Sequence, residues 1–164
     1  MNTNTSLLHS SVEEKVVVCI TPQSNSRRLI DKGAQIAQEH GGQLHILHVQ
    51  KGNTIFQNQE ALKWLEQLFI YGSEMGGMVH ALCDEEIPSC IARFVKEEGV
   101  TKVVLGEVPK PLKKESAKSK KEPLFNRILN ALPKEAQIII VEREEKQQNS
   151  KREGWDARGN YSIA

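Results

Sequence analysis

The sequence predicts an α/β fold in which helices cover both faces of a parallel sheet. Short apolar runs such as residues 15–20 and 137–142 recur along the chain, as expected of strands that are buried on both faces. Segments with the apolar spacing of amphipathic helices separate these runs. A chain that alternates strands and helices in this way forms parallel strands joined by right-handed crossovers. We therefore expect a doubly wound sheet.

Residues that end helices support this alternation. The pair Gly41-Gly42 suits a left-handed cap after the first helix, and Gly99 and Pro133 end the last two helices. The weakest strand signal is at residues 78–83. In chain order, the expected strands are 15–20, 43–49, 78–83, 101–106 and 137–142, and the expected helices are 26–40, 57–74, 87–98 and 124–132.

One domain is expected to fill most of the 164 residues, because domains commonly have ~100–200 residues. We place it at residues 13–143, between a flexible N-terminus (1–12) and a polar, disordered tail (144–164). Residues 107–122 hold six lysines and no apolar periodicity, which predicts a mobile surface loop. This lysine-rich loop is either a solvated insertion or a cover for a phosphate-bearing ligand, and the sequence leaves both open.

Composition excludes several classes of protein. Hydrophobic residues make up 38% and charged residues 26%, as in a globular domain, and a net charge of +1 argues against a general nucleic-acid-binding protein. No apolar run approaches the ~20 residues of a membrane span, so no membrane insertion is expected. The first 14 residues do not resemble a secretory signal, and the three cysteines form no CxxC pair. We expect a reduced, cytoplasmic protein without a disulfide framework or a zinc site.

The predicted topology places a ligand site at the carboxyl ends of the strands, where the strand order reverses. This rule selects the loop at residues 21–26 and the end of the strand at Gly106. The first loop is rich in hydroxyl and amide groups and leads into a helix N-terminus, which attracts anions such as phosphate. Ser24 and Ser26 are either helix caps alone or caps that also contact a ligand. The sequence contains neither GxxxxGK[ST] nor GxGxxG.

Reactive side chains give no catalytic arrangement. Cys19 lies inside a strand and is expected to be buried and inert, and Cys90 follows an acidic segment that would raise its pKa. His45 and His48 are three residues apart on one strand, so they face opposite sides and cannot share a metal. Asp84 and its acidic neighbours precede a helix and are read as caps. We therefore assign no catalytic residue and do not expect an enzyme.

Two segments resemble the universal stress protein family, most closely the domain of this kind in Kdp-type (KdpD-like) potassium-sensor histidine kinases. They are the opening VCI-x-P-x-x-NS-x-x-LI at residues 18–30 and the run VTKVVLG at residues 100–106. The likeness extends from about residue 15 to about residue 142. It implies a five-stranded, Rossmann-like domain of the adenine-nucleotide alpha-hydrolase type, with strand order 3-2-1-4-5.

The resemblance also implies an adenine-nucleotide ligand, either ATP or cyclic di-AMP. ATP-binding members carry an acidic residue after the first strand and a G-x-x-G-x9-G-[ST] loop, whereas this chain has Thr21, Glu107 and Glu122-Pro123 at those places. Glutamate repels phosphate and proline removes a backbone donor, so ATP is the less expected ligand. Sensor domains that bind cyclic di-AMP carry serines after the first strand and a tyrosine in the second, which His48 would replace as a stacking ring. The residues assigned to nucleotide binding are Thr21, Ser24, Ser26, Arg27, His48 and Gly106.

The last strand is expected to join two copies of the chain. It carries no internal proline or lysine, and in this strand order it lies at a sheet edge that a second copy would cover. Alternatively, the tail with Trp155 covers this edge within one chain. The interface residues would be Ile138, Ile139, Ile140 and Val141.

These expectations leave two main hypotheses. The first is a non-catalytic sensor or regulatory domain that binds an adenine nucleotide in stress or potassium-related signalling. The second is a ligand-free, dimerising interaction module that regulates a transport or signalling protein. A third, an enzyme of the wider adenine-nucleotide group, is disfavoured because the phosphate loop is missing.

Overall fold

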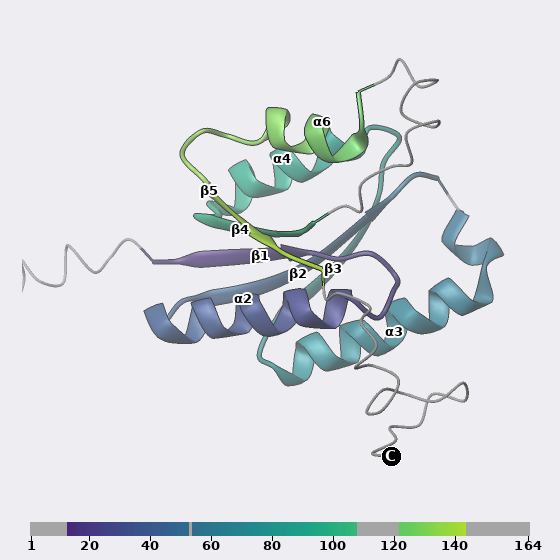
Figure 1. The fold of residues 1–164 in the computed structure, drawn as a ribbon, viewed down its shortest axis with the longest axis horizontal. Helices are drawn as coiled ribbons and strands as arrows, with labels where there is room; N and C mark the ends of the chain where they lie inside the picture. The colour runs from purple at the N-terminus through teal and green to yellow at the C-terminus, as the bar shows by residue number, and fades with distance from the viewer. Residues whose placement is uncertain (1–12, 53, 108–121, 144–164) are drawn as a thin grey trace, which may run out of the picture.

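The computed structural model describes residues 13–52, 54–107 and 122–143, which form a five-stranded parallel sheet between two layers of helices (Figure 1). The strand order is β3-β2-β1-β4-β5, and each neighbouring pair is parallel, which confirms the predicted topology. The strands are β1 (Lys15–Cys19), β2 (Gln43–Gln50), β3 (Met78–Cys83), β4 (Lys102–Gly106) and β5 (Gln137–Val141). The helices are α2 (Ser26–His40), α3 (Gln59–Glu74), α4 (Ile87–Glu98) and α6 (Leu124–Ala131), with a short 3-10 turn, η1 (Thr54–Gln57).

The expected helix at residues 57–74 is in fact two elements, η1 and α3. Asn58 separates them because its backbone is extended, with φ −124° and ψ 101°. Its side chain accepts a hydrogen bond from the N–H of Ala61 at 3.0 Å, which is the geometry of an N-cap. The helix therefore begins at Gln59, and the earlier start that we expected was wrong.

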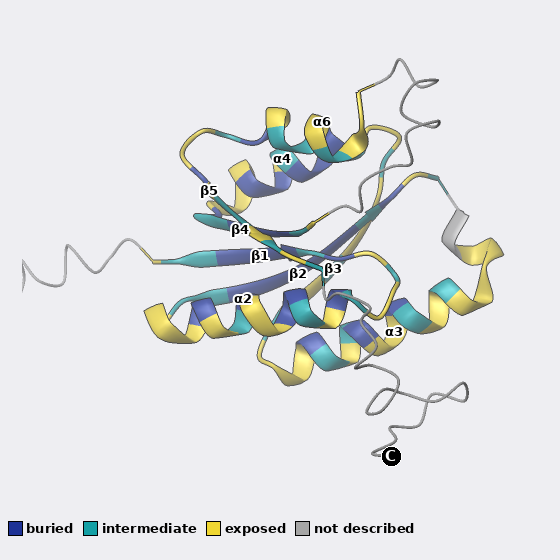
Figure 2. Cartoon of the chain, viewed as in Figure 1, coloured by how far each residue is buried: buried dark blue, intermediate teal, exposed yellow. Residues whose placement is uncertain are grey.

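Two apolar cores lie on opposite faces of the sheet. Side chains of β1 alternate between them: Val16 and Val18 pack with α2 and α3, whereas Val17 packs with α4 and α6. Figure 2 shows that buried residues follow the central strands β1, β2 and β4 and the sheet-facing sides of the helices. This burial on both faces explains why the central strands are almost continuously apolar.

Close packing of α2 on the sheet depends on Gly33. A Cβ atom at this position would lie 2.2 Å from Cγ2 of Val18, far inside van der Waals contact. The helix ends at Gly41, whose φ of 62° is the left-handed conformation that the Gly-Gly pair predicted. These two glycines fix how near α2 lies to β1 and where it ends.

Both edge strands are more exposed than the strands between them. On β3, Met78 is 53% exposed and Val79 and Leu82 are also exposed, so neither face of this strand is fully covered. On β5, Ile140 is 42% exposed, whereas Ile138 and Ile139 pack partly against the two cores. The last strand is thus at a sheet edge, as predicted.

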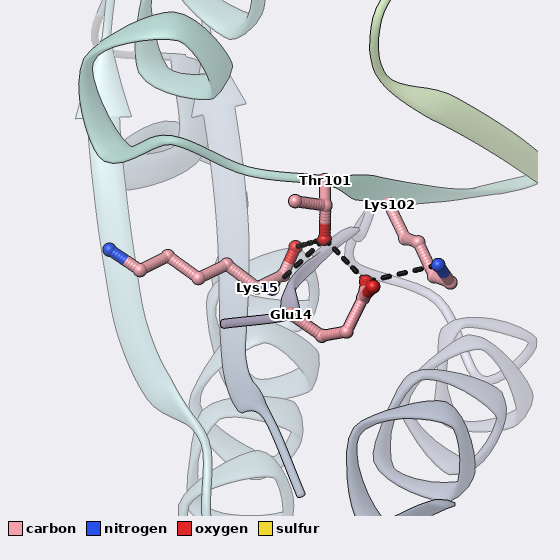
Figure 3. Close-up of polar contacts among 4 residues, drawn as sticks. All are labelled: Glu14, Lys15, Thr101 and Lys102. Atoms are coloured by element: carbon pink, nitrogen blue, oxygen red, sulfur yellow. Dashed lines mark hydrogen bonds and ion pairs between the residues drawn. The ribbon is translucent and has the colours of Figure 1, made fainter. Parts of the chain in front are cut away.

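Glu14 joins β1 to β4 at the amino edge of the sheet (Figure 3). Its Oε1 accepts a hydrogen bond from Oγ1 of Thr101 at 2.7 Å and lies 3.0 Å from Nζ of Lys102. The N–H of Lys15 in turn donates to Oγ1 of Thr101 at 3.0 Å. The hydrogen bond from Thr101, and then Lys102, hold the pKa of Glu14 below its ordinary value.

Several sequence-based expectations lie outside the described residues. They concern the flexible N-terminus at 1–12, most of the lysine-rich loop and the tail at 144–164. Within the described part of the chain, no helix combines the length and apolar character that crossing a membrane requires.

Candidate functional site

The loop between β1 and α2 is closed by the side chain of Ser26. Its Oγ donates to the carbonyl of Thr21 at 2.7 Å and accepts from the N–H of Thr21 at 3.0 Å. Ser26 is 1% exposed and is the first residue of α2. The expected side-chain cap by Ser24 or Ser26 was wrong: Asn25 is the N-cap residue, and its side chain makes no capping hydrogen bond.

Two backbone donors of this loop have no acceptor among the described residues. The N–H groups of residues 26–28 each donate to the carbonyl three residues earlier, at 3.1–3.2 Å, and the N–H of Gln23 donates to Thr21. The N–H groups of Ser24 and Asn25 remain unpaired within the described part of the chain. They lie at the positive end of α2, where an anion or a carbonyl group of a ligand could accept from them.

Both arginines in the first turn of α2 already have partners within the protein. The guanidinium of Arg27 lies 4.0 Å from the centre of the Tyr71 ring on α3, and the Tyr71 hydroxyl donates to Asp31. This hydrogen bond raises the pKa of Tyr71. Nη1 of Arg28 donates to the carbonyl of Glu142 at 2.6 Å and so links α2 to the chain after β5. Sequence reasoning assigned Arg27 to nucleotide binding and foresaw the partner of neither arginine, because Tyr71 and Glu142 are far away in the sequence.

His48 forms a hydrogen bond to Ile20, the residue that precedes the loop. Its ring is 6% exposed, and Nδ1 donates to the carbonyl of Ile20 at 3.0 Å. This bond fixes the hydrogen on Nδ1 and leaves Nε2 without a hydrogen-bond partner among the described residues. The imidazole therefore connects the end of β2 to the loop after β1.

Gly106 ends β4, the strand that pairs with β1 on the other side. A Cβ atom here would lie 3.2 Å from Cδ1 of Leu29, so glycine lets the first turns of α2 pack on the end of β4. The next residue, Glu107, donates its N–H to the carbonyl of Val141 at 2.9 Å and accepts from the N–H of Arg143 at 3.1 Å. A carboxylate thus follows Gly106 at the edge of the sheet.

The structure brings most of the sequence-predicted residues to the carboxyl edge of the sheet. Thr21 and Ser24 are exposed on the loop, Ser26 closes it, and His48 reaches it through Ile20. Gly106 lies at this edge as the last residue of β4 and packs against the side chain of Leu29. Arg27 instead packs against α3.

Burial lowers the reactivity of two of the three cysteines, Cys19 and Cys90, whereas Cys83 on β3 is exposed. Burial raises the pKa of the Cys19 thiol to about 12, and it also raises that of Cys90, against the opposing effect of Arg93. His45 and His48 face opposite sides of β2, as predicted, since His45 contacts Phe94 on α4 and His48 does not. In the described ranges, no three histidine, cysteine or acidic side chains are grouped to hold a metal ion.

The fold is that of universal stress proteins. A universal stress protein from Archaeoglobus fulgidus superposes with a TM-score of 0.61 and 17% identity over 82% of this chain and 98% of that one. Another, solved in complex with cAMP, gives a TM-score of 0.60 and 14% identity over 80% and 98% of the two chains. The Archaeoglobus fulgidus protein in complex with dAMP gives 0.56 and 17% over 79% and 98%. These neighbours confirm the resemblance that the two sequence segments predicted.

Among curated proteins, the chain is similar to KdpD sensor proteins. It is 30% identical over 99 residues to KdpD of Synechocystis sp., which covers 60% of this chain and 26% of that protein. It is 24% identical over 93 residues to KdpD of Mycobacterium tuberculosis, covering 57% and 11%. The chain thus spans about a quarter and about a tenth of these relatives. No family model matches it.

Proposed function

We propose that this domain is a non-catalytic regulatory module that binds an adenine nucleotide at the carboxyl edge of β1 and β4. The observation that carries the proposal is the pair of unpaired backbone donors, Ser24 and Asn25, at the N-terminal end of α2. Donors in this position suit a phosphate or the edge of a base. Two structural neighbours were solved with cAMP and dAMP, which supports the same ligand class here.

Charge at the site favours a nucleotide with few negative charges over ATP. Arg27 and Arg28 are engaged by Tyr71 and Glu142, so neither is held free to neutralise a triphosphate. The carboxylate of Glu107 adds a negative charge directly after Gly106. A ligand whose total negative charge is lower, such as a cyclic nucleotide or cyclic di-AMP with one charge per phosphodiester, or a nucleoside monophosphate, meets less repulsion than ATP.

Similarity to KdpD supports a role in potassium-related or stress signalling. The domain binds its ligand and acts on a transport or signalling partner, in line with the sensor role named for its KdpD relatives. We place this role in the cytoplasm, in line with the composition.

A second candidate is a dimerising interaction module without a ligand. The hydrogen bonds of Ser26 and the internal partners of both arginines favour it, because polar groups expected to meet a ligand are already satisfied. In that case the exposed edge strand β5 would be the functional surface.

Thermal denaturation of the full chain with cAMP, AMP, ATP and cyclic di-AMP separates the two candidates. A nucleotide at 100 times its Kd should add about 2.7 kcal/mol to the free energy of unfolding. Ser24 offers a matched pair of variants, since the hydrogen bond from the N–H of Ser26 to the carbonyl of Gln23 makes Ser24 the first central residue of a turn, where proline is favoured. Ser24→Ala keeps the backbone donor and should retain the shift, whereas Ser24→Pro removes the donor and should lose it.

The unliganded melting temperatures of the two variants provide the control, and they should agree. If no nucleotide stabilises the wild-type chain, the binding proposal is wrong and the interaction module is favoured. If Ser24→Pro folds normally and still shows the full shift, the ligand binds elsewhere.

A further inference from the structure

Two histidines from neighbouring strands face each other on the α4 side of the sheet. Nδ1 of His45 on β2 lies 3.0 Å from Nε2 of His80 on β3, and their rings stack with centroids 5.2 Å apart. Phe94 of α4 lies edge-on to both rings, at 5.9 and 4.8 Å. His45 is 2% exposed, whereas His80 is only half-buried.

Hydrogen bonding fixes where the hydrogens of this pair lie. Oε1 of Gln43 is 3.3 Å from Nε2 of His45 and can only accept, so that nitrogen carries a hydrogen. Nδ1 of His45 then has a lone pair, and Nε2–H of His80 donates to it. The remaining nitrogen, Nδ1 of His80, carries a lone pair and has no hydrogen-bond partner among the described residues.

This arrangement accepts one proton and resists a second. A proton on Nδ1 of His80 leaves its Nε2–H donating to His45, and a charged donor strengthens that bond. A second proton would have to enter on Nδ1 of His45, where it would meet the N–H of His80. Two donors and two positive charges would then face each other across 3.0 Å.

Charged groups on every neighbouring element act on His45. Burial and the charge of His80 on β3 lower the pKa of His45, Lys15 on β1 acts in the same direction, and Glu98 on α4 opposes them. Nζ of Lys15 donates a hydrogen bond to the backbone carbonyl of Glu98 at 3.1 Å, which links β1 to the end of α4.

Loss of the contact between His45 and His80 would weaken the attachment of β3 more than that of any central strand. It is an edge strand with one strand neighbour, and it is exposed on both faces. A strand with so little apolar coverage depends more on individual contacts to its neighbour than a central strand does.

We propose that the His45–His80 pair is a pH-sensitive contact that holds the edge strand β3 to β2. The contact persists when the neutral pair binds one proton, and it breaks when the pair binds a second. This pair binds protons only, and it is separate from the nucleotide site proposed at the carboxyl edge of β1 and β4. As pH falls below the ordinary histidine pKa of about 6.5, the unfolded chain binds one more proton than the folded pair. The folding equilibrium constant should then fall about tenfold per pH unit for that one proton.

The test combines NMR titration of the histidine rings with amide hydrogen exchange on the full chain, from about pH 8 to about pH 5. The ring signals of His45 and His80 should move together in two steps. On acidification, the amides of β3 should lose protection before those of β1. His45→Leu removes the buried imidazole, so β3 should keep its protection and the pH dependence of folding should flatten.

Two further variants keep the proposal falsifiable. His40→Gln removes an exposed histidine at the end of α2 and should leave every one of these results unchanged. His80→Leu removes the partner on β3 and should make the pH profile of β3 exchange the same as that of β1, even if His45→Leu does not fold. Independent single-step titrations of the two rings, or parallel loss of protection in β1 and β3 of the wild type, would overturn the proposal.

Discussion

A single hydroxyl, that of Ser26, closes the loop after β1 by bonding to both the N–H and the carbonyl of Thr21. Serine just before an amphipathic segment is a local signal for a helix cap, but the N-cap residue is Asn25 and Ser26 is already the first residue of the helix. This signal could not predict the bonding, because the partner is decided by how the loop folds back on itself. Ser26 therefore closes the loop, whereas sequence reasoning had left open whether it only caps the helix or also contacts a ligand.

Ser26→Ala should reduce the free energy of unfolding by about 1–2 kcal/mol, because it removes two partly buried hydrogen bonds between Ser26 and the backbone of Thr21. Urea denaturation measures this difference. Ser24→Ala is the matched control: Ser24 is exposed, so its substitution should change stability by no more than about 0.5 kcal/mol. Equal effects of the two substitutions would show that the hydroxyl of Ser26 does not support the loop.

At the scale of elements, apolar runs and helical periodicity predicted the strands and helices well. The main error was at Asn58, where periodicity continued but the backbone did not. An Asn before an apolar helical pattern is a cap signal that could have corrected the helix start. The 3-10 turn before it carries no comparable signal, because a single turn is too short for periodicity to show.

The link between β1 and β4 through Glu14 makes a prediction at this scale. Because its pKa is lowered in the folded state, the carboxylate contributes stability above the ordinary value of 4.5. This contribution is lost as pH falls from 4.5 through the lower folded value. Thr101→Val removes the largest cause of the shift, so it should cost about 1 kcal/mol at neutral pH and weaken the loss of stability on acidification.

Denaturation of wild type and Thr101→Val at several pH values between neutral and acidic measures this effect. Glu14→Gln should show the same reduced acid dependence, because it removes the titrating group itself. An acid dependence that is identical in all three proteins would mean that other carboxylates dominate it.

At the scale of the whole molecule, the alternation of strands and helices predicted the parallel sheet and its two helix layers, and the resemblance to universal stress proteins implied the strand order that the structure shows. A ligand site at the carboxyl edge of the sheet remains a prediction. The detailed site could not be predicted, since it depends on contacts between distant segments. The stacking of Arg27 on Tyr71, 44 residues later, and the bond of Arg28 to Glu142 arise only when α2, α3 and β5 pack together.

Homodimerisation through β5 remains a prediction for the assembled molecule. Ile140 is the most exposed apolar residue of this strand, whereas Ile139 packs partly into the core and is a poorer site for substitution. Light scattering at micromolar concentration should give a dimer mass for the wild type and a monomer mass for Ile140→Lys. Val79→Lys, on the exposed edge strand β3, is the matched control and should remain dimeric. A monomeric wild type would exclude the dimer.

The bond from Arg28 to Glu142 also determines how the domain is connected to anything that follows it. Together with the acceptance of the Arg143 N–H by Glu107, it anchors the chain after β5 beside the first turn of α2. The polypeptide therefore leaves the domain at the same edge as the loop that holds Ser24 and Asn25. Because Arg28 belongs to α2, the carbonyl of Glu142 is held by the same helix that begins at this loop, and not by the sheet alone.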